Sequence, residues 1–172
     1  MLSNCSNKDD FFKTWGTACA KLNGEKWKGE PRAWYKYKNR FDTIGIEAIV
    51  DNKKMGSTTN YISFYSIPKK TGGVVLKRYE YVSQVSQKPF IEASATYETW
   101  DGDVSIDKYD LDTTQTNTFR LIRFDEKTKV LEAEFDLHFV VGEGILGLSY
   151  PDPNAPKTLH FEGGHIKTKI ME

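Results

Sequence analysis

Two histidines near the C-terminal end of the chain, His138 and His160, are of a residue type that suits metal coordination. Imidazole nitrogen is a common ligand of zinc and other transition-metal ions. Both residues fall on polar positions of segments that we expect to pair about a loop centre near Ser149, so their side chains are predicted to lie opposite each other. A metal site needs three or four ligands, and spacing fixes none of the other nearby candidates: Glu134, Asp136, Glu162 and His165. We therefore interpret the two histidines as surface residues of a solvated sheet and assign no metal and no cofactor.

Aspartates between residues 101 and 112 form a second group of candidate ligands, because carboxylates bind hard cations such as calcium. The run consists of Asp101-Gly102-Asp103 followed by Asp107, Asp110 and Asp112. It lacks the ligand spacing of an EF-hand loop. Asp-Gly is typical of a hairpin turn, so this segment predicts a turn followed by a strand with a polar face.

Motifs of catalysis are absent from the sequence. There is no Gly-x-Ser-x-Gly, no His-Glu-x-x-His and no glycine-rich phosphate loop. We expect the protein not to be an enzyme. A glycan-processing enzyme remains an alternative, because the two carboxylates of a glycosidase are brought together in space rather than in sequence. A carrier of an apolar small molecule is another, and it would need an interior cavity lined by aromatic side chains.

Composition limits the classes of partner. The 172 residues suffice for one well-buried core. Lys plus Arg and Asp plus Glu are 24 each, so the formal net charge is zero and no overall field attracts nucleic acid. No apolar run approaches the roughly 20 residues that cross a bilayer. Any association with a membrane is therefore expected to come from an anchor.

Cys5 is the candidate anchor. Leu2-Ser3-Asn4-Cys5 resembles the end of a bacterial lipoprotein signal, in which the cysteine is acylated, and Ser6-Asn7-Lys8-Asp9-Asp10 looks like the export tag of Bacteroidetes-type surface lipoproteins. The resemblance implies a lipid anchor through Cys5 and a location on the outer membrane, at the cell surface. Residues 1–13 are then a signal remnant and flexible tether, and residues 14–172 form a single domain. The alternative use of the thiol is a disulfide with Cys19, which would compete with acylation.

A second resemblance concerns the domain itself. Ala18 to Trp27 looks like the opening hairpin of small Bacteroidetes lipoprotein domains of unknown function, and Leu131 to Phe135 with Phe161 to Gly164 looks like their last paired strands. The resemblance implies fold and location and carries over no functional residues. We expect a non-catalytic binding or accessory module, placed beside an outer-membrane nutrient importer. Its partner would be an outer-membrane protein or a glycan.

The elements that must position these residues are strands. Phe, Trp and Tyr make up 13% of the chain, and no window has the apolar spacing of an amphipathic helix. We predict an all-β fold, an antiparallel β-sandwich, with a lipocalin-like β-barrel as the alternative. In 131–139 odd positions are apolar and even positions polar, which is typical of a half-buried strand. Further strands are predicted at 17–22, 32–37, 43–50, 60–67, 74–81, 91–100, 104–111 and 119–124.

The C-terminal strand has an irregular pattern. Leu159 and Phe161 place the core face on odd positions, whereas Ile166 and Ile170 place it on even ones. One extra residue at a β-bulge produces this change, and Gly163-Gly164 tolerates the left-handed backbone that a bulge requires. We expect a tight turn at 125–128 and pairing of 131–140 with 158–170.

Two groups of side chains are candidates for ligand or partner binding. The long loop from Val141 to Lys157 carries four apolar residues: Ile145, Leu146, Leu148 and Tyr150. They would form a contact surface if exposed, or would close the open end of the sandwich if folded back. Trp34 and Trp100 lie on the polar side of their predicted strands and could stack on a sugar ring, although aromatics on strands more often pack in a core.

Overall fold

The computed structural model describes residues 16–37, 40–51, 58–78, 92–102, 104–142 and 152–171. Within these ranges the chain forms ten strands and no helix, and no helical segment has the length and hydropathy of a membrane span. The strands are β1 (Thr17–Leu22), β2 (Glu25–Tyr37), β3 (Arg40–Asp51), β4 (Thr58–Pro68), β5 (Gly72–Val75), β6 (Ser94–Asp101), β7 (Val104–Leu111), β8 (Thr118–Phe124), β9 (Val130–Val141) and β10 (Thr158–Met171). The predicted all-β fold is confirmed.

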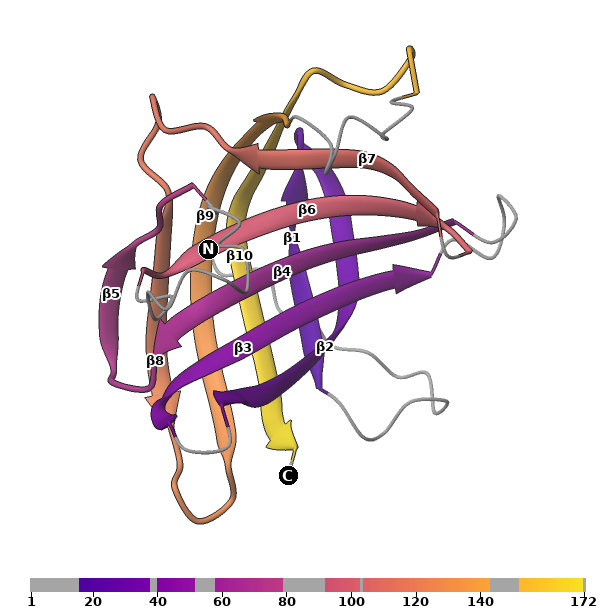
Figure 1. The fold of residues 1–172 in the computed structure, drawn as a ribbon. Helices are drawn as coiled ribbons and strands as arrows, with labels where there is room; N and C mark the ends of the chain where they lie inside the picture. Colours follow the sequence, from indigo (N-terminus) through magenta and orange to yellow (C-terminus); the bar gives the residue numbers. More distant parts are fainter. Residues whose placement is uncertain are drawn as a thin grey trace, which may run out of the picture.

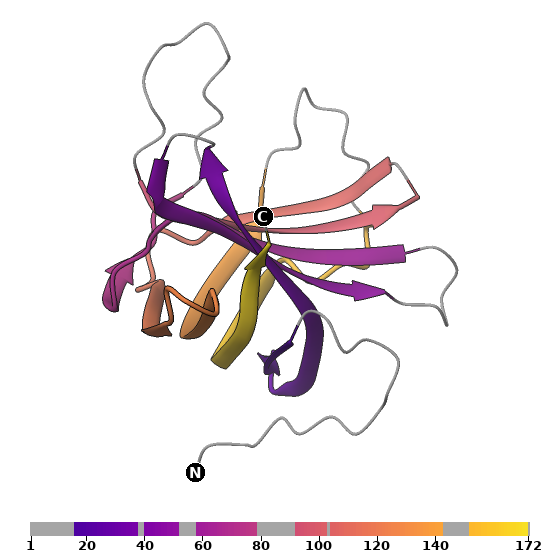
Figure 2. The ribbon, with the colours of Figure 1, turned by 90° about the horizontal axis from the view of Figure 1, so that it is seen from below.

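The strands form one ten-stranded sheet in the order β1-β10-β2-β3-β4-β6-β7-β9-β8-β5, and an additional β9–β10 pairing closes it into a ring. In Figure 1, β3, β4, β6 and β7 run across β8, β9 and β10, which lie behind them at a steep angle. Figure 2, seen from below, shows the same two layers edge-on. The sheet therefore folds over on itself and encloses its core between layers whose strands cross.

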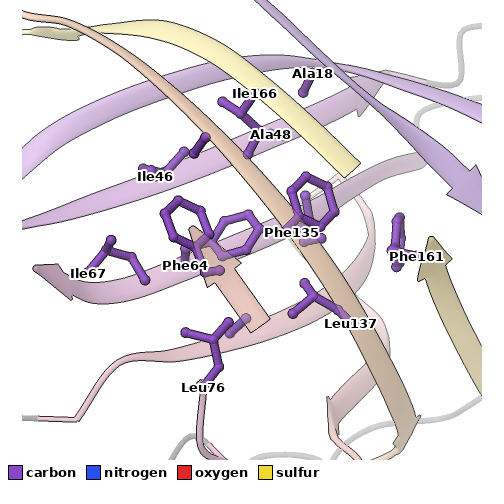
Figure 3. Packing of buried hydrophobic residues seen from close by; sticks show 14 of the residues in the cluster. Ala18, Ile46, Ala48, Phe64, Ile67, Leu76, Phe135, Leu137, Phe161 and Ile166 are labelled. Atoms are coloured by element: carbon purple, nitrogen blue, oxygen red, sulfur yellow. The ribbon is translucent and has the colours of Figure 1, made fainter. Parts of the chain in front are cut away.

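The core consists of side chains from both layers that contact one another. Phe64 of β4 lies 5.0 Å from Phe119 and 5.3 Å from Phe135, ring centre to ring centre. Tyr97 of β6 lies 5.4 Å from Phe161 of β10. Figure 3 shows Phe64 and Phe135 facing each other within this cluster. The aromatic side chains that an apolar carrier would need around a cavity thus pack against each other, and this alternative gains no support.

Two predicted strands, β2 and β5, have different bounds in the structure. Asn23 and Gly24 have φ angles of 50° and 86°, which a two-residue turn between antiparallel strands requires, so β2 begins at Glu25 rather than at the predicted residue 32. Of the predicted strand 74–81, the described residues form β5 as far as Val75. The Leu76 N–H still donates to the carbonyl of Asn117, which continues the β5–β8 register by one residue, and Lys77 then forms an isolated bridge with Ser94. Residues 79–81 lie outside the described residues.

The predicted pairing of the last two strands and its bulge are confirmed. Register runs from Thr158 opposite Val140 to Lys169 opposite Val130. Between Phe161 and Gly164 β10 advances three residues while β9 advances two, and Gly163 has a φ angle of 59°. The tight turn at 125–128 is also present, closed by the Lys129 N–H donating to the carbonyl of Asp125. The bulge restores the core face of β10, so that both halves of the strand bury their apolar side chains.

Gly164→Ala is expected to destabilise the protein. A Cβ atom at this position would lie 2.3 Å from the Phe135 ring, which is held in the core at 3% exposure. Relieving that overlap should cost about 1–3 kcal/mol of the free energy of unfolding, measured by urea denaturation. Gly73→Ala is the matched control, because a Cβ there meets nothing within 4 Å. Equal unfolding midpoints for the two variants would show that the Phe135 ring can make room for a Cβ atom at position 164.

Candidate functional site

A groove on the outer side of β1, β10, β9, β8 and β5 is the candidate site. Odd residues of β9 from Leu131 to Phe139 are buried, so the even ones face outward, as the alternation predicts. The groove has a volume of about 1010 Å³. Its described lining residues are Thr17, Cys19, Gly73, Val74, Val75, Thr118, Phe119, Arg120, Ile122, Glu132, Glu134, Phe135, Asp136, Gly163, Gly164, His165 and Lys167. We call this surface the outer-face groove.

Charged side chains of both signs pair across the floor of the outer-face groove. Arg120 of β8 is in register with Glu134 of β9, and its Nε donates to Glu134 Oε2 at 3.2 Å. His165 Nε2 of β10 lies 2.9 Å from Glu132 Oε1. The Arg120 side chain remains 60% exposed, so this ion pair adds little to stability and leaves donors free for a ligand. The floor is therefore ordered but still accessible.

Apolar side chains lie at one side of the groove. Val75 is 63% exposed and Ile122 is 40% exposed. They are two of the four exposed large hydrophobic residues in the described part of the chain, the others being Val104 and Val141. Because β5 pairs with β8, Val75 and Ile122 both border Arg120. Exposed apolar groups beside an arginine resemble the composition of protein–protein contact surfaces.

His138 and His160 lie directly opposite each other on β9 and β10, as the sequence predicted. The backbone N–H of His138 donates to Asn117 Oδ1 at 2.7 Å, and that of His160 donates to Asn23 Oδ1 at 2.8 Å. Their carbonyls accept from Asp112 and Asn23. All four backbone groups thus point away from the β9–β10 ladder, which makes this a non-hydrogen-bonded pair, the type whose side chains approach most closely.

Asp136 joins the two histidines at the end of the outer-face groove. Its Oδ1 lies 3.0 Å from His160 Nε2 and 3.6 Å from His138 Nε2. The imidazole rings stack with their centres 4.0 Å apart and their planes at 12°. We call Asp136, His138 and His160 the His–Asp cluster. Asp136 was one of four candidate third ligands between which the sequence did not decide, although its place two residues before His138 puts both side chains on one face of the strand.

A further negative charge lies near the His–Asp cluster. Asp112, in the β7–β8 loop, accepts hydrogen bonds from the backbone N–H and the hydroxyl of Thr114. These bonds, with a smaller contribution from the nearby His138, hold the pKa of Asp112 below its usual value. Asp112 is therefore ionised at neutral pH and makes its surroundings favourable to a cation.

Several of the other predicted site residues cannot be placed relative to this surface. Cys5 and the loop residues Ile145, Leu146, Leu148 and Tyr150 lie outside the described residues. Trp34 is opposite Gly45 of β3. Trp100 is opposite Thr59 of β4, and Thr59 is in turn opposite Asp51 of β3, six residues from Gly45. At about 3.3 Å per residue the backbone positions of the two tryptophans are roughly 20 Å apart along the strand direction. They do not form one platform.

The aspartates of 101–112 do not converge either. Asp101 precedes β7 and Asp112 follows it, so they lie at opposite ends of that strand. Asp110 accepts a hydrogen bond from Arg78 at 2.8 Å, and Asp107 accepts one from the backbone N–H of Asp152 at 3.0 Å. Each described carboxylate thus has its own partner, and the strand-and-turn interpretation of this segment accounts for them.

Comparisons with protein-family models, curated proteins and solved structures find no match to this chain. The site is therefore interpreted from its own geometry.

Proposed function

We propose that this protein is a non-catalytic, lipid-anchored binding module of the cell surface, and that it binds an outer-membrane protein through the outer-face groove. The observation that carries the proposal is the composition of the groove. Its accessible arginine, its paired charges and its two exposed apolar residues belong together on one face. Protein interfaces combine apolar anchors and arginine with polar side chains in this way.

A protein partner fits the groove better than a glycan. Sugar rings stack on accessible aromatic faces. The aromatic residues that line the groove in the described part of the chain are Phe119 and Phe135, and they are only 0% and 3% exposed. Neither ring offers a face to a sugar. A polypeptide, in contrast, can pair with Arg120 and contact Val75 and Ile122.

The tether brings the groove within reach of a membrane protein. Thr17 is the first residue of β1, lines the groove and follows Cys5 by 12 positions in the sequence. A chain of that length spans at most about 40 Å when extended. With Cys5 acylated, the groove would stay within about 40 Å of the bilayer surface, where the exposed loops of an outer-membrane importer lie.

Replacing Cys5 by alanine tests the anchor. We expect wild-type protein in cells to incorporate a palmitate analogue and to sediment with outer membranes, because acylated bacterial lipoproteins are held by several chains. The Cys5→Ala variant should lose both the label and the membrane association, while Cys19→Ala keeps them.

Retained label in Cys5→Ala would contradict the anchor. Cys19 is disulfide-bonded in the structure, so the anchor requires that this bond does not involve Cys5 in the mature protein. Mass spectrometry under non-reducing conditions that finds Cys5 bonded to Cys19 would contradict the anchor, because the same sulfur cannot carry a thioether-linked lipid and a disulfide.

A further inference from the structure

We propose that the His–Asp cluster binds a divalent transition-metal ion, with Zn²⁺ the ion that its donors suit best. The ligands are Asp136 Oδ1, His138 Nε2 and His160 Nε2, whose ligand atoms lie within 4.8 Å of one another. This site shares Asp136 with the lining of the outer-face groove, but it does not depend on the protein contact proposed there.

Donor chemistry and spacing both support the ion. Two imidazole nitrogens and a carboxylate oxygen are a set that Zn²⁺ accepts readily, whereas Ca²⁺ and Mg²⁺ prefer oxygen alone. Ligand atoms placed about 2.0–2.2 Å from zinc at tetrahedral angles are roughly 3.3–3.5 Å apart. Asp136 Oδ1 lies 3.0 Å from one histidine nitrogen and 3.6 Å from the other, which brackets that separation.

Backbone hydrogen bonds fix the positions of the two histidines. Asn117 and Asn23 each accept the N–H of one histidine, so both positions are fixed from outside the β9–β10 ladder. Asn117 is 1% exposed, and its Nδ2 also donates to the carbonyl of Asp112 at 2.8 Å. The ligands thus lie on strands rather than on a loop, and one of the two supports, Asn117, is buried, so little chain entropy is lost when an ion binds.

Binding requires a modest rearrangement of the rings. A coordinating imidazole holds its ion close to the ring plane, and two rings with planes at 12° and centres 4.0 Å apart cannot both do so. One or both rings must therefore turn about the Cβ–Cγ bond. The side chains are 29% and 40% exposed, so solvent leaves room for that turn. Three protein ligands leave a fourth position of a tetrahedral ion for water or for a donor from another molecule.

His165 provides a matched control within the same sheet. It is the third histidine of the chain, lies on the outer side of β10 and pairs with a carboxylate, Glu132, at 2.9 Å. It differs from His160 in having no second histidine opposite it, because its partner in register on β9 is Glu134. A general affinity of exposed histidine–carboxylate pairs for metal would involve His165, whereas the proposed site does not.

The test is a titration of the metal-free full chain with ZnCl₂, followed by calorimetry, and with CoCl₂, followed by visible absorption. We expect one equivalent of Zn²⁺ to bind to wild type and to the His165→Ala variant. His138→Ala and His160→Ala should each weaken binding by roughly 100-fold or more, because loss of a direct ligand costs at least as much as loss of its supporting contacts.

Nuclear magnetic resonance of the imidazole nitrogens in the wild-type protein tests the same site, and it does not require that the alanine variants fold. Added Zn²⁺ should shift the His138 and His160 signals and leave His165 unchanged. Absence of binding to wild type would overturn the proposal. Binding that survives His138→Ala, or that shifts His165 as strongly as the other two, would overturn it as well.

Discussion

Reversing the charge of Arg120 is expected to reduce capture of the outer-membrane partner by about 30-fold or more, since removing an interfacial hot-spot side chain costs at least about 2 kcal/mol. Arg120 lines the outer-face groove, with Ile122 two residues further along β8 and Val75 on the neighbouring strand, opposite Thr118. An arginine with accessible donors can hold a carboxylate of the partner through two hydrogen bonds, and glutamate repels it. Capture is measured by quantitative mass spectrometry on detergent-solubilised outer membranes.

Arg32→Glu is the control for Arg120→Glu. Arg32 belongs to the other layer of the sheet and pairs across strands with Glu47, with Nε donating to Oε2 at 2.7 Å, as Arg120 pairs with Glu134. Both variants place two glutamates opposite each other, which costs only about 0.2–1 kcal/mol of stability. The Arg32 variant should therefore capture the partner like wild type. Equal capture by both variants would show that the partner does not bind through Arg120 in the groove.

Phe161→Ala is expected to lower the free energy of unfolding by about 3–5 kcal/mol, the range for large aromatic truncations in a core. Phe161 is fully buried in β10, and its ring contacts aromatic rings from both layers. The ring centres are 5.3 Å from Trp27, 5.4 Å from Tyr97 and 5.9 Å from Phe139. Its removal would leave a cavity where the layers meet, and a rigid aromatic cluster closes such a cavity poorly.

The measurement for Phe161→Ala is urea unfolding followed by tryptophan fluorescence. Val104→Ala serves as the reference, because Val104 is 58% exposed and should change stability by less than about 0.5 kcal/mol. A cost below about 1 kcal/mol for Phe161→Ala would mean that the two layers are not held together by this cluster.

Local patterns in the sequence predicted the features that depend on neighbouring residues. The alternation in β9, the Asn23-Gly24 turn and the bulge at Gly163 each follow from periodicity or from backbone preferences. The end of β5 did not follow, because Lys77 bridges Ser94 instead of continuing along β8. The pairing of β9 with β10 was predicted, whereas the parallel β10–β2 pairing and the β7–β9 pairing that complete the ring are long-range contacts that local periodicity does not encode.

The candidate site was predicted in part. The position of His138 opposite His160 followed from pairing the strands about their loop, and strand alternation contained the signal for Asp136. The register shift at the bulge and the two asparagine contacts, which decide how closely the rings approach, come from the folded structure alone. The groove was not predicted, because its residues come from five strands whose order in the sheet was unknown.

Photo-cross-linking in living cells shows whether the outer-face groove contacts an outer-membrane protein, as we propose. A cross-linking amino acid is placed at Val75 in the groove or, as a control, at Val104 on the other layer. Both positions are exposed, at 63% and 58%. We expect one discrete adduct with an outer-membrane protein from position 75 and none from position 104. An adduct from position 104 alone, or none from either position, would contradict it.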